Sequence, residues 1–163
     1  MLRTVGLALG ALVAMEPATY AAHRWLMHGV GMILHRSHHR WSGDAGRFEA
    51  NDGFPLAFGS LTVAVMFAGY HAPALAWALP VTAGISAYGT AYLFVHDVYI
   101  HGRVGRLREW APLEYLREAH RIHHLFGGEP YGMLCPIVSR DLRARAATTT
   151  RDPIAARIGT ISS

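Results

Sequence analysis

The chain has 163 residues, a length that suits one domain, and only 16% of them are charged, whereas soluble domains carry about 25%. Because 52% are hydrophobic, the composition excludes an ordinary soluble protein and points to a membrane. All 15 basic residues are arginine, and most flank apolar segments, a pattern of cytoplasmic membrane-protein loops rather than of nucleic-acid binding. The single cysteine, Cys135, excludes a disulfide framework and a thiolate metal site.

Residues 2–22 are mostly apolar, with Arg3 and Glu16 as interruptions. A secretory signal peptide is one interpretation of such a start. However, the cationic beginning is minimal and the apolar run leads directly into a histidine cluster, so we expect a retained transmembrane helix. About 20 residues at about 1.5 Å each match the hydrocarbon core of a bilayer.

Two more apolar runs, 54–71 and 74–95, are each long enough to span a bilayer, and a short turn around Pro73 separates them. They predict a helical hairpin. The polar stretch 30–53 before them predicts a helix near 32–40 and then a loop. Dividing the last run at Pro80 would give four spans, but it would put histidine clusters on opposite sides of the membrane, so we favour three.

After His96 the chain turns polar. Pro112 predicts the start of a helix that Gly127 and Gly128 end. Beyond residue 139 the chain is rich in arginine, threonine and serine, and we expect a poorly ordered, non-catalytic tail. The predicted division is therefore a membrane domain, 1–138, and a polar C-terminal tail, 139–163.

Together these segments predict an all-α fold, an integral membrane helical bundle of about three transmembrane helices with a histidine-rich cap. Three spans place 23–53 and 96–163 on the same side of the membrane. The arginines lie mainly on that side, which we therefore expect to be the cytoplasmic face of the cytoplasmic membrane.

Ten of the 11 histidines fall in four clusters, and only His71 lies outside them. The spacings HX4H and HX2HH occur in that order, twice: His23 and His28; His35, His38 and His39; His96 and His101; His120, His123 and His124. On a helix HX2HH places its rings on one face. HX4H spans about 140° of rotation, so we expect its helix to end or bend at Gly29 and at Gly102.

Neutral imidazole is the commonest metal ligand in proteins, and the repeated spacing predicts metal binding by all ten clustered histidines. Ten ligands exceed what one ion accepts, so we expect two metals with about five nitrogen ligands each. Candidates for holding the ligand rings from outside are Glu16, Asp52 and Asp97. Beyond the metal ligands we expect no catalytic side chain. A dinuclear iron centre at a membrane face suits oxygenation of an unactivated C–H bond in an apolar substrate.

Four stretches carry a resemblance to a known family: AMEPATYAAHRWLMHG, HRSHHR, FVHDVYIHGR and AHRIHH. They resemble the membrane-bound, histidine-rich di-iron family of fatty acid hydroxylases, sterol desaturases and carotenoid hydroxylases, and most closely its bacterial carotenoid branch. The resemblance covers roughly residues 14–135. It implies that the ten clustered histidines bind two iron ions and that 1–138 is a di-iron hydroxylase domain.

The resemblance further implies an O2-dependent hydroxylase acting on the β-ionone rings of carotenoids, with ferredoxin and NAD(P)H-ferredoxin reductase as electron donors. A fatty acid or sterol hydroxylase or desaturase would have the same metal ligands and differ in its cavity. A non-catalytic metal carrier, a haem protein or a zinc transporter fits the spacing less well, because zinc transporters place ligands at mid-membrane beside acidic partners.

A carotenoid never leaves the bilayer, so we expect it to enter from lipid between helices. The third apolar run offers small residues along which an apolar rod can lie, namely Gly84, Ser86, Ala87, Gly89 and Ala91. Tyr88 and Tyr92 precede His96 by two turns and one turn and are candidates to flank the ring. The same small residues also suit simple helix packing.

Overall fold

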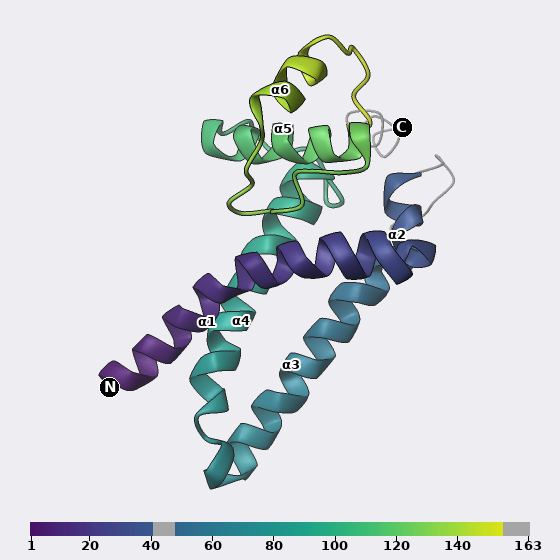
Figure 1. Cartoon of the computed structure of the whole chain (residues 1–163). Helices are drawn as coiled ribbons and strands as arrows, with labels where there is room; N and C mark the ends of the chain where they lie inside the picture. The colour runs from purple at the N-terminus through teal and green to yellow at the C-terminus, as the bar shows by residue number, and fades with distance from the viewer. Residues whose placement is uncertain (41–47, 155–163) are drawn as a thin grey trace.

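The computed structural model describes residues 1–40 and 48–154, and every regular element within these ranges is a helix. Three helical stretches are long and apolar enough to cross a membrane: Leu2–Val30, Ala50–His71 and Ala78–Ile100. The predicted all-α class with three membrane helices is therefore confirmed. Figure 1 shows these helices below a cap that contains α2 (Met32–His39), α5 (Ala111–Phe126) and α6 (Arg140–Ala147).

The helices α1 (Leu2–Ala21) and α4 (Ala78–Leu93) cross in close contact. A Cβ atom at Gly84 would lie 2.1 Å from the carbonyl oxygen of Ala8, so only glycine permits this approach. Gly84 thus serves helix packing, as small residues do in many membrane proteins. Gly89, further along α4, is exposed, and in the described part of the chain no atom lies within 4 Å of the place that a Cβ atom would take.

The helices α3 (Gly53–His71) and α4 form the predicted hairpin, joined through Ala72 and the short helix η3 (Pro73–Leu75). Because Pro73 starts a separate 3-10 turn, α4 begins at Ala78, four residues later than predicted. In Figure 1 the two helices meet at this turn and separate toward the cap.

The hydrophobic core lies where the cap meets α4, rather than among the spans. It joins the π-helix η4 (Phe94–Ile100) to α5 and the C-terminal region through Val95, Tyr99, Ile100, Leu113, Met133 and Ile154. By contrast, α1 has no buried residue and α3 has one, Gly69. The spans therefore present apolar surface suited to lipid, while the cap packs like a soluble domain.

The tail is ordered further than predicted. Ser139 accepts a hydrogen bond from the Leu142 amide and caps α6, which packs against α5, and the Arg145 guanidinium lies 4.4 Å from the centre of the Phe126 ring. Ile154 is 1% exposed. The expectation of a poorly ordered tail is wrong through residue 154, because single apolar residues of this polar segment, Ala146 and Ile154, are buried. Residues 155–163 lie outside the described part.

The topology can be tested with reporter fusions to the intact chain. A reporter inserted at Ala72–Pro73 and one fused to the C-terminal end should face opposite sides of the membrane, because one span, Ala78–Ile100, separates them. Alkaline phosphatase and green fluorescent protein fusions measure the two sides. Reporters active on the same side would contradict the three-span arrangement.

Candidate metal centre

The two HX4H clusters lie on π-helices, not on α-helices that end at the second histidine. His23 and His28 belong to η1 (Ala22–Val30), and His96 belongs to η4. The amide of His101 donates to the carbonyl of His96 at 3.0 Å, the i→i+5 bond that defines a π turn. This bond brings the second histidine above the first, so a five-residue spacing places both rings on one face.

Both predicted breaks after these histidines are present. Gly29 has non-helical angles, φ −96° and ψ −118°, and Gly102 has φ 60°, a left-handed conformation that favours glycine. The HX2HH clusters lie on α2 and α5, as predicted, and Gly127, with φ 65°, ends α5.

The ten clustered histidines converge as two neighbouring sets of rings. The first histidine group has its ligand atoms within 4.8 Å of one another and consists of His23, His28, His35, His39 and His123. The second histidine group meets the same limit through His38, His96, His101 and His120, and His124 joins it with Nε2 at 2.9 Å from His120 Nε2 and 3.2 Å from His38 Nε2. The expected number of about five nitrogens for each metal matches this division.

Each half of the chain supplies four rings to one group and a single ring to the other. Within α2, His35 and His39 belong to the first group and His38 to the second; within α5, His120 and His124 belong to the second and His123 to the first. The HX2HH rings therefore do not all point to one metal, as the spacing had suggested. The i, i+4 pair serves one group and the middle residue crosses to the other, which locks the two halves together.

The outer nitrogens of three rings of the first group face neutral oxygen atoms. His23 Nδ1 lies 3.0 Å from the carbonyl oxygen of Tyr131, and His35 Nδ1 lies 2.7 Å from Asn51 Oδ1. His123 Nδ1 lies against the carbonyl oxygen of Gly128. A nitrogen facing such an acceptor carries the proton, so these contacts fix the tautomer and leave Nε2 with a lone pair directed inward.

The outer nitrogens of two rings of the second group, His38 and His96, face carboxylates. His38 Nδ1 lies 3.3 Å from Glu49 Oε2, and His96 Nδ1 lies 3.2 Å from Asp97 Oδ2. Arg103 ties these carboxylates together, with its guanidinium 3.2 Å from Glu49 Oε1 and 2.9 Å from Asp97 Oδ1. The two ligand rings are thus oriented by a network rather than by isolated contacts.

Burial keeps the cap histidines neutral. Desolvation, reinforced by neighbouring imidazoles, lowers the pKa of His39 to about 3. Desolvation also lowers the pKa of His35 to about 4, although the hydrogen bond to Asn51 opposes it. The same cause holds the pKa well below its usual value for His38, His101, His120, His123 and His124. The neutral ring is the form that binds metals.

The spacing of the inner nitrogens fits bound metal ions. His23 Nε2 lies 3.2 Å from His35 Nε2, and His38 Nε2 lies 3.1 Å from His96 Nε2. All four rings carry their proton on Nδ1, so two lone pairs face each other and no hydrogen bond can form. Two nitrogens at right angles, each about 2.1 Å from one ion, lie about 3.0 Å apart. The residues present therefore suit a metal in each group.

Glu16 lies within the first span and anchors a loop that reaches the first group. Its carboxylate accepts hydrogen bonds from the amides of Met133, Leu134 and Cys135, at 3.0–3.1 Å, and from the Tyr88 hydroxyl at 2.6 Å. These four donors offset the cost of a carboxylate in a membrane helix. The anchored loop carries the Tyr131 carbonyl that faces His23, so Glu16 touches no ligand and acts on one through the backbone.

The other candidates occupy different places. Asp97 faces His96, whereas Asp52 contacts no histidine and instead binds Arg103 and the Glu49 amide. Tyr92 stacks on His96 with ring centroids 5.2 Å apart, and Tyr88 points to Glu16. Gly89 lies on an exposed face of α4, as noted above.

Three outer partners were not predicted, namely Glu49, Asn51 and Arg103. They lie at the borders of the spans: Glu49 directly precedes Ala50–His71, Asn51 lies at its start, and Arg103 follows His101-Gly102. The sequence signal that could have identified them is the presence of polar side chains near a histidine cluster. The Tyr131 and Gly128 partners are carbonyl oxygens, which every residue has, so no sequence pattern could identify them.

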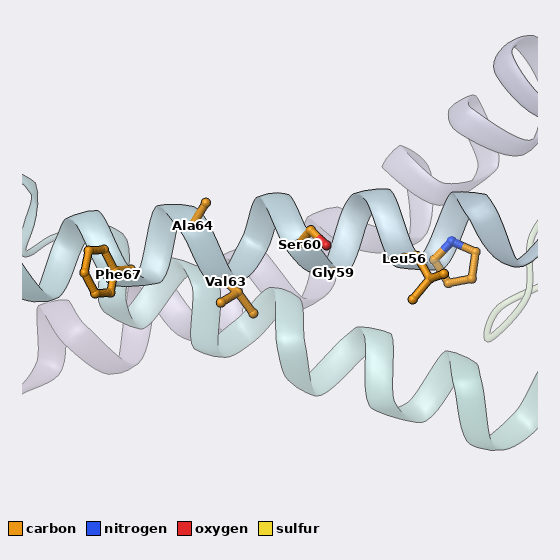
Figure 2. A pocket seen from close by; sticks show the side chains of 7 residues that line it. Leu56, Gly59, Ser60, Val63, Ala64 and Phe67 are labelled. Atoms are coloured by element: carbon orange, nitrogen blue, oxygen red, sulfur yellow. The ribbon is translucent and has the colours of Figure 1, made fainter.

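A shallow apolar groove runs along α3 within the second span. Figure 2 shows the side chains that line it, which recur every three or four residues and so share one helix face: Pro55, Leu56, Gly59, Ser60, Val63, Ala64 and Phe67. Its Pro55 end adjoins Phe54, whose ring centroid is 6.4 Å from that of His35. The groove therefore leads from mid-span toward the first histidine group.

Comparisons with known proteins agree on one family. The model of the fatty acid hydroxylase family matches residues 8–141. The chain is 39% identical to a chloroplastic beta-carotene 3-hydroxylase of Oncidium hybrid cultivar over 139 residues, which is 82% of this chain and 45% of that protein. It is 36% identical to a beta-carotene hydroxylase of Pseudescherichia vulneris over 123 residues, covering 72% and 66%.

A chloroplastic beta-carotene 3-hydroxylase of Arabidopsis thaliana is also 36% identical, with 82% of this chain and 44% of that protein covered. The chain thus spans less than half the length of these plant relatives. No solved structure matches. The family predicted from the histidine boxes is confirmed.

The role of Glu16 can be tested by substitution. Glu16→Leu leaves three loop amides without their acceptor, so we expect metal affinity to fall about 10- to 100-fold, the usual effect of losing an outer partner. The loss should fall on one of two metals, measured by elemental analysis of purified protein. Tyr88→Phe is the matched control, since it removes one of four donors and should retain both metals. Full metal content in Glu16→Leu would contradict the role.

Proposed function

The chain belongs to the fatty acid hydroxylase family, and from this premise we propose that it is a membrane di-iron monooxygenase acting on carotenoids. The proposed reaction hydroxylates β-ionone rings and converts β-carotene to β-cryptoxanthin and zeaxanthin with O2. The observation that carries the proposal is the pair of five-imidazole groups, with inward lone pairs, at one end of three apolar helices. The names of the relatives support the substrate class.

In this proposal the histidines ligate and the outer partners hold the rings. Two bound iron ions would supply O2 activation: with two electrons from an external donor and two protons, one oxygen atom would enter the C–H bond and the other would leave as water. The contacts at Nδ1 keep Nε2 unprotonated in five of these rings: His23, His35, His38, His96 and His123. Burial of the rings, with His123 at 0% exposed and His101 at 1%, excludes bulk water from the centre.

The substrate reaches the centre from the bilayer. A carotenoid is an apolar rod, and the groove on α3 is an apolar path that points toward Phe54 and the first histidine group. We propose that the polyene lies along this groove while the ring approaches the histidines. Tyr92, stacked on His96, is positioned to contact the ring from α4.

We further propose that the histidine groups face the cytoplasm in the cytoplasmic membrane. The arginine-rich segments that surround the groups support this orientation. An electron donor is required by the reaction, and ferredoxin with its NAD(P)H-dependent reductase is the proposed source.

A fatty acid or sterol hydroxylase or desaturase is the second candidate. The family model that matches is described as fatty acid hydroxylase, and the ligand set would serve either chemistry. The two functions differ in substrate, so pigment and lipid analyses of the same cells separate them.

The proposed function is tested in cells that make β-carotene. Expression of the chain should convert β-carotene to hydroxylated products, seen by chromatography, and purified protein should contain about two irons per chain. Unchanged pigments together with altered lipids would favour the second candidate.

Loss of a ligand from either group should abolish the activity. His123→Ala removes a ring from the first group and His38→Ala removes one from the second. Loss of an outer partner typically costs about 10- to 100-fold in activity, and each of these two variants should lower hydroxylation by more than that. Membrane insertion should persist, as judged by fractionation. The control is His71→Ala, which alters the one histidine outside both groups. Full activity in either ligand variant would contradict the assignment.

Substitutions at two glycines can distinguish a substrate path along α3 from one along α4. Gly59 lines the groove on α3, whereas Gly89 lies on α4, and a Cβ at either position meets no atom within 4 Å. Gly59→Phe should therefore reduce turnover of the carotenoid without changing iron content or insertion, whereas Gly89→Phe should have little effect. The reverse result would place the substrate along α4 instead.

A further inference from the structure

The two histidine groups differ in the charge of their outer partners. Three rings of the first group face neutral oxygen atoms: the carbonyls of Tyr131 and Gly128 and the side-chain amide of Asn51. In the part of the chain that the structure describes, no carboxylate pairs with a ring of this group. The corresponding partners in the second group are the carboxylates of Glu49 and Asp97.

The carboxylates of the second group are held in place by Arg103. The guanidinium pairs with Glu49, Asp52 and Asp97 at 2.8–3.2 Å. One guanidinium thus contacts three carboxylates and holds two of them, Glu49 and Asp97, behind ligand rings. The side chains of His38 and Glu49 are each 1% exposed, which limits screening of the carboxylate charge by water.

Negative charge behind a ligand ring changes the metal in front of it. A carboxylate that accepts the Nδ1 proton raises the basicity of the imidazole, and this stabilises a higher positive charge on the bound ion. The distances of 3.2 and 3.3 Å are long for hydrogen bonds, but Coulomb energy falls only with the inverse of distance, so the charge still acts. Carbonyl and amide oxygens exert the same kind of effect more weakly.

We infer that the two metal centres are electronically unequal, and that the metal in the second histidine group is the more easily oxidised. Glu49 and Asp97 are the residues that cause the difference, acting through His38 and His96. They are positioning residues, since neither is a member of the ten-histidine ligand set. The inference rests on the proposed function in one respect, namely that both groups hold iron.

This inference can be tested by removing the charge of one outer partner in the second group and adding a charge to one outer partner in the first group. Glu49→Gln keeps an oxygen acceptor and removes the charge behind His38, while Asn51→Asp adds a charge behind His35. The measurement is an anaerobic redox titration of the purified whole chain, loaded with 57Fe and followed by Mössbauer spectroscopy. The signal that moves in Asn51→Asp belongs to the first group and the one that moves in Glu49→Gln to the second.

In the unaltered protein the two irons should oxidise in sequence, the iron of the second group first. Glu49→Gln should make that iron harder to oxidise by about tenfold in its equilibrium constant, which is about 59 mV for one electron. Asn51→Asp should make the other iron easier to oxidise. The double variant, with one carboxylate behind a ring of each group, should bring the two potentials close together. Asp52→Asn is the matched control, because it also removes a partner of Arg103 but contacts no histidine, and its shift should be smaller.

Oxidation of both irons at one potential in the unaltered protein would overturn the inference, as would equal shifts in Glu49→Gln and Asp52→Asn. Either result would leave the proposed function intact, since two irons would still be present. Protein that binds no iron in either group would instead overturn the proposed function, and the inference with it. If Glu49→Gln does not retain its metal, the direction of the Asn51→Asp shift decides the question alone.

Discussion

Ten imidazole rings whose Nε2 atoms approach one another to 2.9–3.2 Å cannot be held together by their own interactions. Where Nδ1 carries the proton, the facing Nε2 atoms both present lone pairs, and these repel. The arrangement therefore suits cations between the rings and depends on acceptors behind them. The loop held by Glu16, the amide of Asn51 and the Arg103 network all lie behind the rings and limit their rotation.

The exchange of one ring between the two halves follows from helix geometry. On α2 and α5 the i, i+4 rings point one way and the ring before the last points toward the other group. Each metal would consequently join residues from both halves, so filling one centre also ties α2 to α5. The contact of His39 with His124, whose ring centroids are 4.4 Å apart, shows how closely the two groups adjoin.

The distribution of buried residues between the spans and the cap is consistent with a membrane environment. Helices surrounded by lipid keep apolar side chains on their outer surface, which agrees with the small buried fraction of α1 and α3. Burial is concentrated instead in the cap, where η4, α5 and the segment ending at Ile154 share one core. A packed cap over open spans suits the approach of apolar molecules from the bilayer while water is kept from the rings.

Much of this protein is determined by local sequence. The three spans follow from runs of apolar residues, and the ligand set follows from a spacing that occurs twice, because both are properties of short segments. The helix ends at Gly102 and Gly127 were likewise predictable, since glycine adopts a left-handed conformation without steric cost. The unexpected order of residues 139–154 was not, because its cause is the burial of single apolar side chains by distant elements.

Tertiary structure alone decided which ring belongs to which group and what lies behind each ring. The spacing HX4H suggested diverging rings on an α-helix, and only the π turn, stabilised within the folded cap, brings them together. The partners Glu49, Asn51 and Tyr131 come from segments 11, 16 and 108 residues away from the rings they face. Contacts over such separations depend on how helices cross and loops close, and no pattern within one segment records them.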